Sequence, residues 1–150
     1  LDPSRNNFPV TLHDPCNVTR SMGIVEPQRR ILRKICPQFR EMTPHGVNNY
    51  CCGGGSGFAI MQGSNFPDWR NKISGRRKFG QVLNAFQDSI GPETHKYVCA
   101  PCSNCKGQFR DLLGYYDAWE RCSILYGGLV ELIVNAMVDV KEPFIEWDFH

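Results

Sequence analysis

The sequence predicts an α/β domain with a small, mainly parallel sheet flanked by helices. Short apolar segments typical of strands alternate with segments whose apolar residues recur at helical spacing. Three groups of cysteines each follow a predicted strand. Because ligands bind at the carboxyl ends of parallel strands, this pattern predicts that the cysteine loops share one edge of the sheet. The 150 residues fit a single domain, 1–150, which can bury a core without disulfides.

The first half of the chain contains two predicted strands and one helix. Residues 8–13 (FPVTLH) form the first strand and lead through Asp-Pro to Cys16. A helix is predicted between Pro27 and Pro37, because proline suits a first turn and apolar residues follow at helical spacing. A second strand at residues 39–42 (FREM) leads into the loop that delivers Cys51-Cys52. Both strands therefore precede cysteines.

The second half contains one further predicted strand. Residues 96–100 (KYVCA) form it, and a helix continues through 108–113. Other helices are predicted at 58–61, at 71–90 before a Gly-Pro pair, and at 129–138 after a Gly-Gly pair. The apolar face of the 71–90 helix is predicted to comprise Ile73, Phe79, Val82, Leu83 and Phe86.

The charge balance argues against nucleic acid as a partner. The chain has 17 Lys and Arg against 15 Asp and Glu. One basic cluster is interpreted as a solvated helix face or a protein docking patch, and it comprises Arg70, Lys72, Arg76, Arg77 and Lys78. No apolar run suits direct membrane insertion, and no signal peptide is recognised, so we expect a cytoplasmic location. Leu1 in place of Met suggests a piece of a longer chain.

Five cysteines from three loops have the spacing of a metal centre. They are Cys16, the adjacent pair Cys51-Cys52, and the Cys102-x-x-Cys105 motif. Neighbouring cysteines do not easily pair with each other, because a disulfide needs Cα atoms about 4.4–6.8 Å apart. A zinc site uses four ligands, which leaves one thiol over, whereas iron–sulfur clusters tolerate varied spacing. Gly53 and Gly54 offer backbone N–H groups beside such a cluster.

Four motifs in order resemble the cysteine-rich CCG domain. They are HDPCNVTR (13–20), EPQRRILRKI (26–35), NYCCGGGSG (49–57) and APCSNC (100–105), with the dipeptide EM (41–42) between the second and the third. That domain occurs in heterodisulfide reductase, in the iron–sulfur subunit of glycolate oxidase and in DsrK/HmcF/TmcB-type subunits. This chain is most similar to the C-terminal domain of a DsrK/HmcF-like protein. The resemblance covers about residues 8–113 and leaves a helix and tail at 114–150.

The resemblance implies a noncubane [4Fe–4S] cluster held by five cysteines, Cys16, Cys51, Cys52, Cys102 and Cys105, with Gly53 and Gly54 beside it. Cys51 and Cys52 would be the catalytic pair, in reductive cleavage or formation of a disulfide of a small molecule or small protein.

The chain has one copy of the motif and lacks ferredoxin-like cluster motifs. Electrons would then come from other redox subunits or domains of a larger complex, and such partners could hold the domain at the inner face of the membrane. The alternative is a non-catalytic electron relay or structural module with a cubane cluster or zinc, and zinc is also a substitute to consider in the first interpretation. A disulfide-bonded interaction domain is disfavoured by the adjacent cysteines.

Three other cysteines have less specific interpretations. Cys99 forms a CxxCxxC run with Cys102, which suits a cubane cluster, but a buried structural thiol is favoured. Cys36 and Cys122 are interpreted as inert thiols, with a pairing between them left open.

Several polar residues near the motifs have two interpretations each. His13 and His45 are either donors to a cluster or substrate, or loop histidines bonded to backbone. Asp14 is expected to cap the turn that follows it, and Arg20 either balances cluster charge or lies at the surface. The aromatic C-terminal segment 142–150 either packs on the domain or docks onto a partner subunit.

Overall fold

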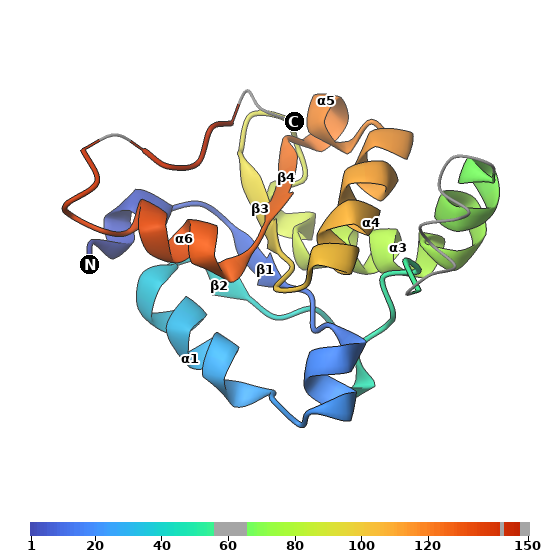
Figure 1. The fold of residues 1–150 in the computed structure, drawn as a ribbon. Helices are drawn as coiled ribbons and strands as arrows, with labels where there is room; N and C mark the ends of the chain where they lie inside the picture. Colours follow the sequence, from blue (N-terminus) through green and yellow to red (C-terminus); the bar gives the residue numbers. More distant parts are fainter. Residues whose placement is uncertain (56–65, 142, 148–150) are drawn as a thin grey trace.

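A four-stranded parallel sheet forms the centre of the molecule (Figure 1). The structure is a computed structural model that describes residues 1–55, 66–141 and 143–147. Within these residues the strand order is β2-β1-β3-β4, and every neighbouring pair is parallel. The strands are β1 (Val10–Leu12), β2 (Phe39–Arg40), β3 (Lys96–Cys99) and β4 (Ile124–Gly127). The predicted α/β class with a small parallel sheet is confirmed.

Helices cover both faces of the sheet (Figure 1). One face carries α1 (Glu26–Ile35) and α6 (Leu129–Asn135). The other carries α3 (Arg76–Ala85) and α4 (Ser103–Tyr115), with the short α5 (Ala118–Cys122) beside it. Shorter helical turns are η1 (Pro3–Asn6), η2 (Asn17–Ser21), η3 (Gly46–Asn48), η4 (Trp69–Ser74) and η5 (Gln87–Ser89).

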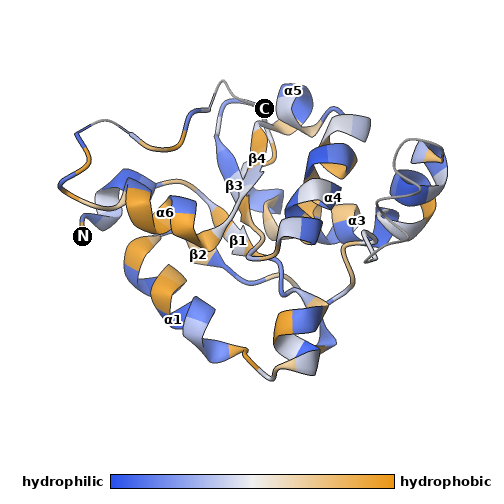
Figure 2. Cartoon of the chain, viewed as in Figure 1, coloured by the Kyte–Doolittle hydropathy of each residue, from blue (hydrophilic) through white to orange (hydrophobic). Residues whose placement is uncertain are grey.

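The central strand β3 divides the core into two halves, because successive side chains of a strand point to opposite faces. Tyr97 and Cys99 pack with α1 and α6, whereas Val98 packs with α3 and α4. All four residues of β3 are buried. Figure 2 shows apolar residues gathered on α6 and on the adjoining part of α1. Burial on both faces is what a parallel sheet between two helical layers requires.

Three strands were predicted from the sequence, and β4 was missed. The helix before it ends at Cys122 and is followed by Ser123, a non-glycine residue with φ of +52°, so no glycine or proline marks this turn. The extended conformation of β4 therefore depends on its backbone pairing with β3, which begins where the Lys96 N–H donates to the Ser123 carbonyl at 2.9 Å. The Gly-Gly pair ends the strand and precedes a helix, α6, which ends at Asn135 rather than at residue 138.

The predicted helix 71–90 is broken at Gly75. Its first part is η4, its second part is α3, and a Cβ at Gly75 would lie 2.8 Å from both Gln108 and Leu112 of α4. Ile73, expected on the buried face, is 64% exposed, whereas Arg70 and Asn71 are the buried residues of η4. The predicted helix at 108–113 is part of the longer α4. The helix predicted at 58–61 lies outside the described residues.

Candidate metal centre

The five candidate cysteines come from loops at the carboxyl ends of β1, β2 and β3. Cys16 follows β1, and Cys51 and Cys52 follow the loop that leaves β2 and contains η3. Cys102 is the residue before α4, and Cys105 lies in its first turn. Because the strands are parallel, their carboxyl ends share one edge, as the sequence predicted.

The deepest part of the site is a compact group of three donors. The Sγ atoms of Cys52 and Cys105 are 3.5 Å apart. A ring nitrogen of His13 lies with them, and the three atoms are all within 4.8 Å of one another. All three residues are buried, and all eight cysteines are free thiols. Free, converging sulfur and imidazole donors are the chemistry of a metal site.

The other cysteines extend this group toward the surface. Cys51 is exposed, and its sulfur accepts the Gly53 N–H at 3.4 Å. Cys102 is half-buried, and its sulfur lies 3.9 Å from the Asn17 amide nitrogen. Cys16, the neighbour of Asn17, is exposed. The structure therefore brings the sulfurs of Cys52 and Cys105 together with His13, whereas Cys16, Cys51 and Cys102 lie nearer the surface on the neighbouring loops.

Glycines shape the loop that carries the adjacent cysteines. Gly53 has φ of +83°, and a Cβ there would lie 2.6 Å from the Ser74 backbone. Gly54 donates its N–H to Cys52 Sγ at 3.3 Å, and a Cβ there would lie 2.9 Å from Gln108. Both glycines thus let the backbone approach η4 and α4 while their N–H groups point at sulfur. Such N–H···S bonds stabilise negative charge on sulfur.

Polar contacts fix this loop to the rest of the site. Arg20 donates at 2.7 Å to the carbonyls of Val47 and Asn49. The Asn49 Oδ1 atom accepts from Lys78 Nζ at 2.9 Å, and Ser74 Oγ donates to the Gly53 carbonyl at 2.9 Å. Arg20 is exposed, which agrees with the surface interpretation, and its guanidinium there binds the backbone of the loop.

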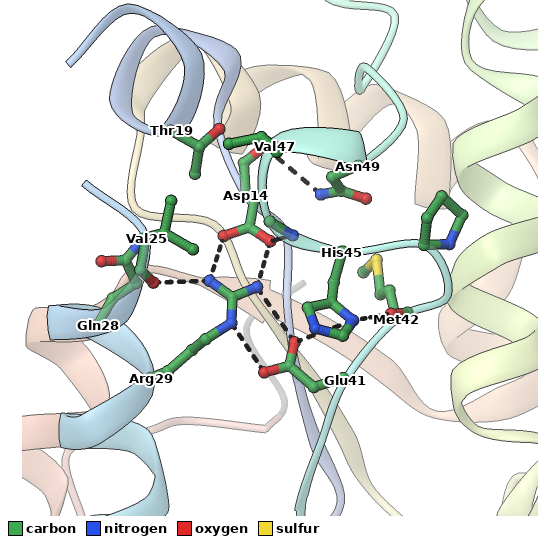
Figure 3. A network of polar contacts seen from close by, with 12 residues as sticks. Asp14, Thr19, Val25, Gln28, Arg29, Glu41, Met42, His45, Val47 and Asn49 are labelled. Atoms are coloured by element: carbon green, nitrogen blue, oxygen red, sulfur yellow. Dashed lines mark hydrogen bonds and ion pairs between the residues drawn. The ribbon is translucent and has the colours of Figure 1, made fainter. Parts of the chain in front are cut away.

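A buried ion-pair network joins the first cysteine loop to α1 and to the end of β2 (Figure 3). Arg29 pairs with Asp14 and donates to Glu41 Oε1 at 2.8 Å. Asp14 Oδ2 also accepts the Gly46 N–H at 2.6 Å. The expectation that Asp14 caps the following turn is therefore wrong, because its carboxylate faces Arg29 and the loop before Cys51. His45 Nδ1 contacts the Met42 carbonyl at 3.1 Å, in agreement with a loop histidine bonded to backbone.

The thiols of the adjacent pair hold their protons firmly in the absence of metal. Hydrogen bonding to Cys105 raises the pKa of Cys52 to about 12, and burial acts in the same direction. Hydrogen bonding to Cys52 and burial raise the pKa of Cys51 as well. Metal binding must therefore displace these protons, so affinity for a metal rises with pH.

Two buried basic residues near the cysteines, Lys78 and His13, also have shifted pKa values. Burial lowers the pKa of Lys78 to about 7, although the nearby thiols and Asp14 act in the opposite direction. Burial, with a smaller effect of Lys78, also lowers the pKa of His13 well below its usual value. Both ring nitrogens of His13 lack a hydrogen-bond partner among the described residues.

The basic cluster is only partly a solvated face. Lys78 is fully buried, and Arg70 is 7% exposed and pairs with Asp111 at 3.0 Å. The interpretation as a surface patch is wrong for these two residues. The sequence did carry a signal for Lys78, because it precedes Val82 and Phe86 by one and two helical turns on the buried face of α3.

The three remaining cysteines lie away from this group. Cys99 is fully buried in the core half that contains α1 and α6, and burial raises its pKa well above the usual value. Cys36 is buried in the same half, whereas Cys122 packs against the other half. This placement agrees with structural thiols.

The C-terminal segment packs partly on the domain. The Trp147 ring lies 4.8 Å from the Phe8 ring and 4.6 Å from the His95 ring. Phe144 is 48% exposed, and Phe149 lies outside the described residues. None of the helices described here has the length and apolar character needed to cross a membrane.

The family model of the cysteine-rich domain named CCG matches residues 10–110 of this chain. The chain belongs to the CCG cysteine-rich domain family. The matched residues contain the five candidate cysteines and His13.

Curated relatives from two archaea match almost the whole chain. One is the Hdr-like menaquinol oxidoreductase iron-sulfur subunit 2 of Archaeoglobus fulgidus, 33% identical over 92% of this chain. Another is the Hdr-like menaquinol oxidoreductase iron-sulfur subunit of Archaeoglobus profundus, 30% identical over 92% of this chain. An uncharacterized iron-sulfur protein of Methanococcus maripaludis is 29% identical over 77% of the chain.

These relatives are much longer than this chain. The chain spans 23% of each of the two Archaeoglobus subunits and 20% of the Methanococcus protein. No solved structure gives a significant match.

Proposed function

We propose that this chain is an iron–sulfur redox domain of a larger oxidoreductase similar to heterodisulfide reductase. The cofactor is a noncubane [4Fe–4S] cluster, and its ligands are Cys16, Cys51, Cys52, Cys102 and Cys105. The observation that carries the proposal is the convergence of free thiols, including an adjacent pair, at one edge of the sheet. The names of the Archaeoglobus relatives, which describe iron-sulfur subunits, support it.

The reaction of this domain is the reductive cleavage of a disulfide, or the reverse. Cleavage of one disulfide to two thiols consumes two electrons and two protons. When bound, the cluster would supply one-electron steps and an iron site for a substrate thiolate. The electrons come from another redox domain or subunit, because this chain has no second set of cluster motifs.

The residues of this chain have two roles at the centre. Some give the substrate access to it, and others stabilise negative charge on its sulfurs. Cys51 is exposed, so a substrate reaches the centre from its side, whereas Cys52 lies on the buried side. The N–H groups of Gly53 and Gly54 point at the two sulfurs and favour their thiolate forms. Lys78 is buried nearby and offsets negative charge when it is protonated. These features favour a centre that gains and loses electrons with little rearrangement.

A second candidate function is a structural or electron-relay metal module without turnover. The close grouping of Cys52, Cys105 and His13 favours it, because three such donors fit around one zinc ion.

Metal analysis with EPR on anaerobically purified protein tests the proposal. We expect about four irons per chain with matching sulfide, and an EPR signal of the oxidised form that Cys52→Ser abolishes or alters. Cys122→Ser is the matched control, because Cys122 precedes β4 and therefore lies toward the opposite edge of the sheet. Its iron content and signal are expected to equal those of the wild type.

Addition of a small thiol to the oxidised protein separates catalysis from relay. A change in the EPR signal that depends on thiol concentration supports a substrate site at the centre. One zinc per chain without sulfide after anaerobic reconstitution contradicts the iron–sulfur proposal. If the protein binds iron but its EPR signal does not change when thiol is added, the result supports the electron-relay function.

The partners proposed for the domain are redox subunits of a quinol-linked complex. The support is the name of the Archaeoglobus relatives, which includes menaquinol oxidoreductase. We place the domain in the cytoplasm, at the inner face of the membrane, where such partners would hold it. Co-purification of a membrane subunit with the tagged full-length protein tests this placement, and its absence from mild detergent extracts contradicts it.

A further inference from the structure

His13 is a buried residue whose polar atoms have no explained role. It is 1% exposed, and neither ring nitrogen has a hydrogen-bond partner among the described residues. Its ring packs edge-on against Phe109, with centroids 5.4 Å apart, so the imidazole is held in place. Its backbone N–H donates to the Cys99 carbonyl at 2.8 Å, which extends the β1 pairing to this residue.

Buried polar side chains in native proteins nearly always have a partner. A histidine kept only for packing would therefore have a carbonyl, a carboxylate or a hydroxyl within reach. His13 instead directs a nitrogen to within 4.8 Å of the sulfurs of both Cys52 and Cys105, without a hydrogen bond to either. The missing partner is thus on the side of the thiols.

The dimensions of this group match a single metal ion between its three atoms. Metal–sulfur bonds of about 2.3 Å and metal–nitrogen bonds of about 2.0–2.1 Å place tetrahedral ligand atoms roughly 3.5–3.8 Å apart. The two sulfurs are already at 3.5 Å, and a small shift of the imidazole closes the remaining gap.

We propose that His13 is a direct metal ligand at the buried end of the centre, beside Cys52 and Cys105. The centre then has six protein donors, five thiolates and one imidazole. This inference rests on the proposed function only in requiring that the site holds a metal. A neutral imidazole adds no negative charge to an iron–sulfur centre, so the reduction potential is higher than it would be with a further thiolate in the same place. His13 would accordingly tune the centre as well as hold it.

Pulsed EPR on wild-type protein tests coordination without any variant. Protein reconstituted anaerobically with iron and sulfide is prepared with ¹⁴N-histidine and with ¹⁵N-histidine. A strongly coupled nitrogen whose frequencies change with the isotope is expected. The same comparison is made on the Co²⁺-loaded protein. Absence of an isotope-sensitive coupling in both forms overturns the proposal.

Two variants then assign the nitrogen to His13. His13→Gln should abolish the isotope-sensitive coupling. It should also raise the dissociation constant for Co²⁺ by at least about tenfold, measured by titration of the visible absorption of the bound Co²⁺. His45→Gln is the matched control, because His45 is half-exposed and contacts the Met42 carbonyl rather than the sulfurs. Equal Co²⁺ affinity of wild type and folded His13→Gln overturns the proposal. Should His13→Gln fail to fold, the isotope comparison on wild type and His45→Gln decides.

The two proposals fail in different ways. A protein that takes up no iron–sulfur cluster but binds Co²⁺ through a histidine nitrogen contradicts the proposed function and supports the ligand. A protein with about four irons and no nitrogen coupling contradicts the ligand and leaves the function standing.

Discussion

Gly53 combines two features that only glycine permits. Its φ is +83°, and the space for a Cβ is filled by the Ser74 backbone at 2.6 Å. The first feature alone costs about 1–3 kcal/mol for another residue, and backbone atoms do not yield as a flexible side chain does. The Cys51-Cys52 loop therefore depends on this residue for its position against η4.

We predict that Gly53→Ala lowers the free energy of unfolding by at least about 2 kcal/mol. It should also reduce metal content, because the loop with both cysteines must move. Gly55→Ala is the matched control, since a Cβ there meets no described atom within 4 Å. Denaturant unfolding and metal analysis measure both effects. Equal stability and metal content in the two variants would contradict this account of the loop.

Lys78 makes the stability of the metal-free protein depend on pH. Its pKa is about 7 in the folded protein, below the usual value of 10.5. Between these values the unfolded chain binds a proton that the folded protein lacks, so stability increases as pH rises. Below pH 7 both states are protonated, and the penalty for burying the charge is fully present.

As pH rises, the stability of the wild type is expected to increase relative to that of Lys78→Met. From pH 7.5 to 8.5 the difference between the two proteins should change by about 1 kcal/mol. The thiols titrate in both proteins, and their raised pKa values lower stability at higher pH. Denaturant unfolding of the reduced, metal-free proteins at both pH values measures the difference. Parallel pH profiles would show that Lys78 keeps its usual pKa.

At the scale of elements, the sequence predicted what local signals determine. The strands before Cys16 and Cys102, and the α1 helix between prolines, carry such signals. Strand β4 does not, because its preceding turn uses Ser123 with positive φ and its conformation depends on pairing with β3. The break at Gly75 likewise depends on α4, a partner distant in the sequence.

The candidate site likewise combines residues that local sequence motifs reveal with residues that only contacts distant in the sequence bring together. Spacing and family motifs led to the five cysteines. The sequence left two interpretations for His13, and the structure places it beside Cys52 and Cys105 without a hydrogen bond to backbone from its ring. The structure added Lys78, whose neighbours are brought together only by the fold. It also reassigned Asp14 from a local cap to a link between β1, α1 and the loop before Cys51.

The Asp14 network should therefore be a strong contributor to stability. Asp14→Asn removes a charge from a buried pair with Arg29 while it keeps the shape of the side chain. Breaking one partner of a buried pair costs about 3–5 kcal/mol, because the other charge stays buried. Glu26→Gln is the matched control, since Glu26 pairs with Arg33 at 3.6 Å where both side chains are exposed. Glu26→Gln should change the free energy of unfolding by no more than about 0.5 kcal/mol. Thermal and denaturant unfolding measure both, and similar losses in the two variants would contradict the network's role.

At the scale of the whole molecule, the fold sorts its eight cysteines by exposure. Cys16 and Cys51 are exposed, Cys102 and Cys122 are half-buried, and the others, Cys36, Cys52, Cys99 and Cys105, are buried. In Cys36 burial alone raises the pKa to about 12, which suppresses the reactive thiolate. The native metal-free protein should therefore react with a thiol reagent in a fixed order.

We predict that iodoacetamide modifies Cys16 first, then Cys102 and Cys122, and the four buried thiols only on unfolding. Cys51 is exposed, but its raised pKa makes it react more slowly than Cys16. Loading with metal should protect Cys16, Cys51 and Cys102 and leave Cys122 as reactive as before, because only the first three belong to the proposed ligand set. Mass spectrometry of tryptic peptides, taken over time from metal-free and loaded protein, measures each rate. Cys16 sits at the exposed end of the site, so it gives the sharpest test. If Cys16 reacts at the same rate in both samples while Cys51 is protected, the centre is held by four cysteines and the five-thiolate set is wrong.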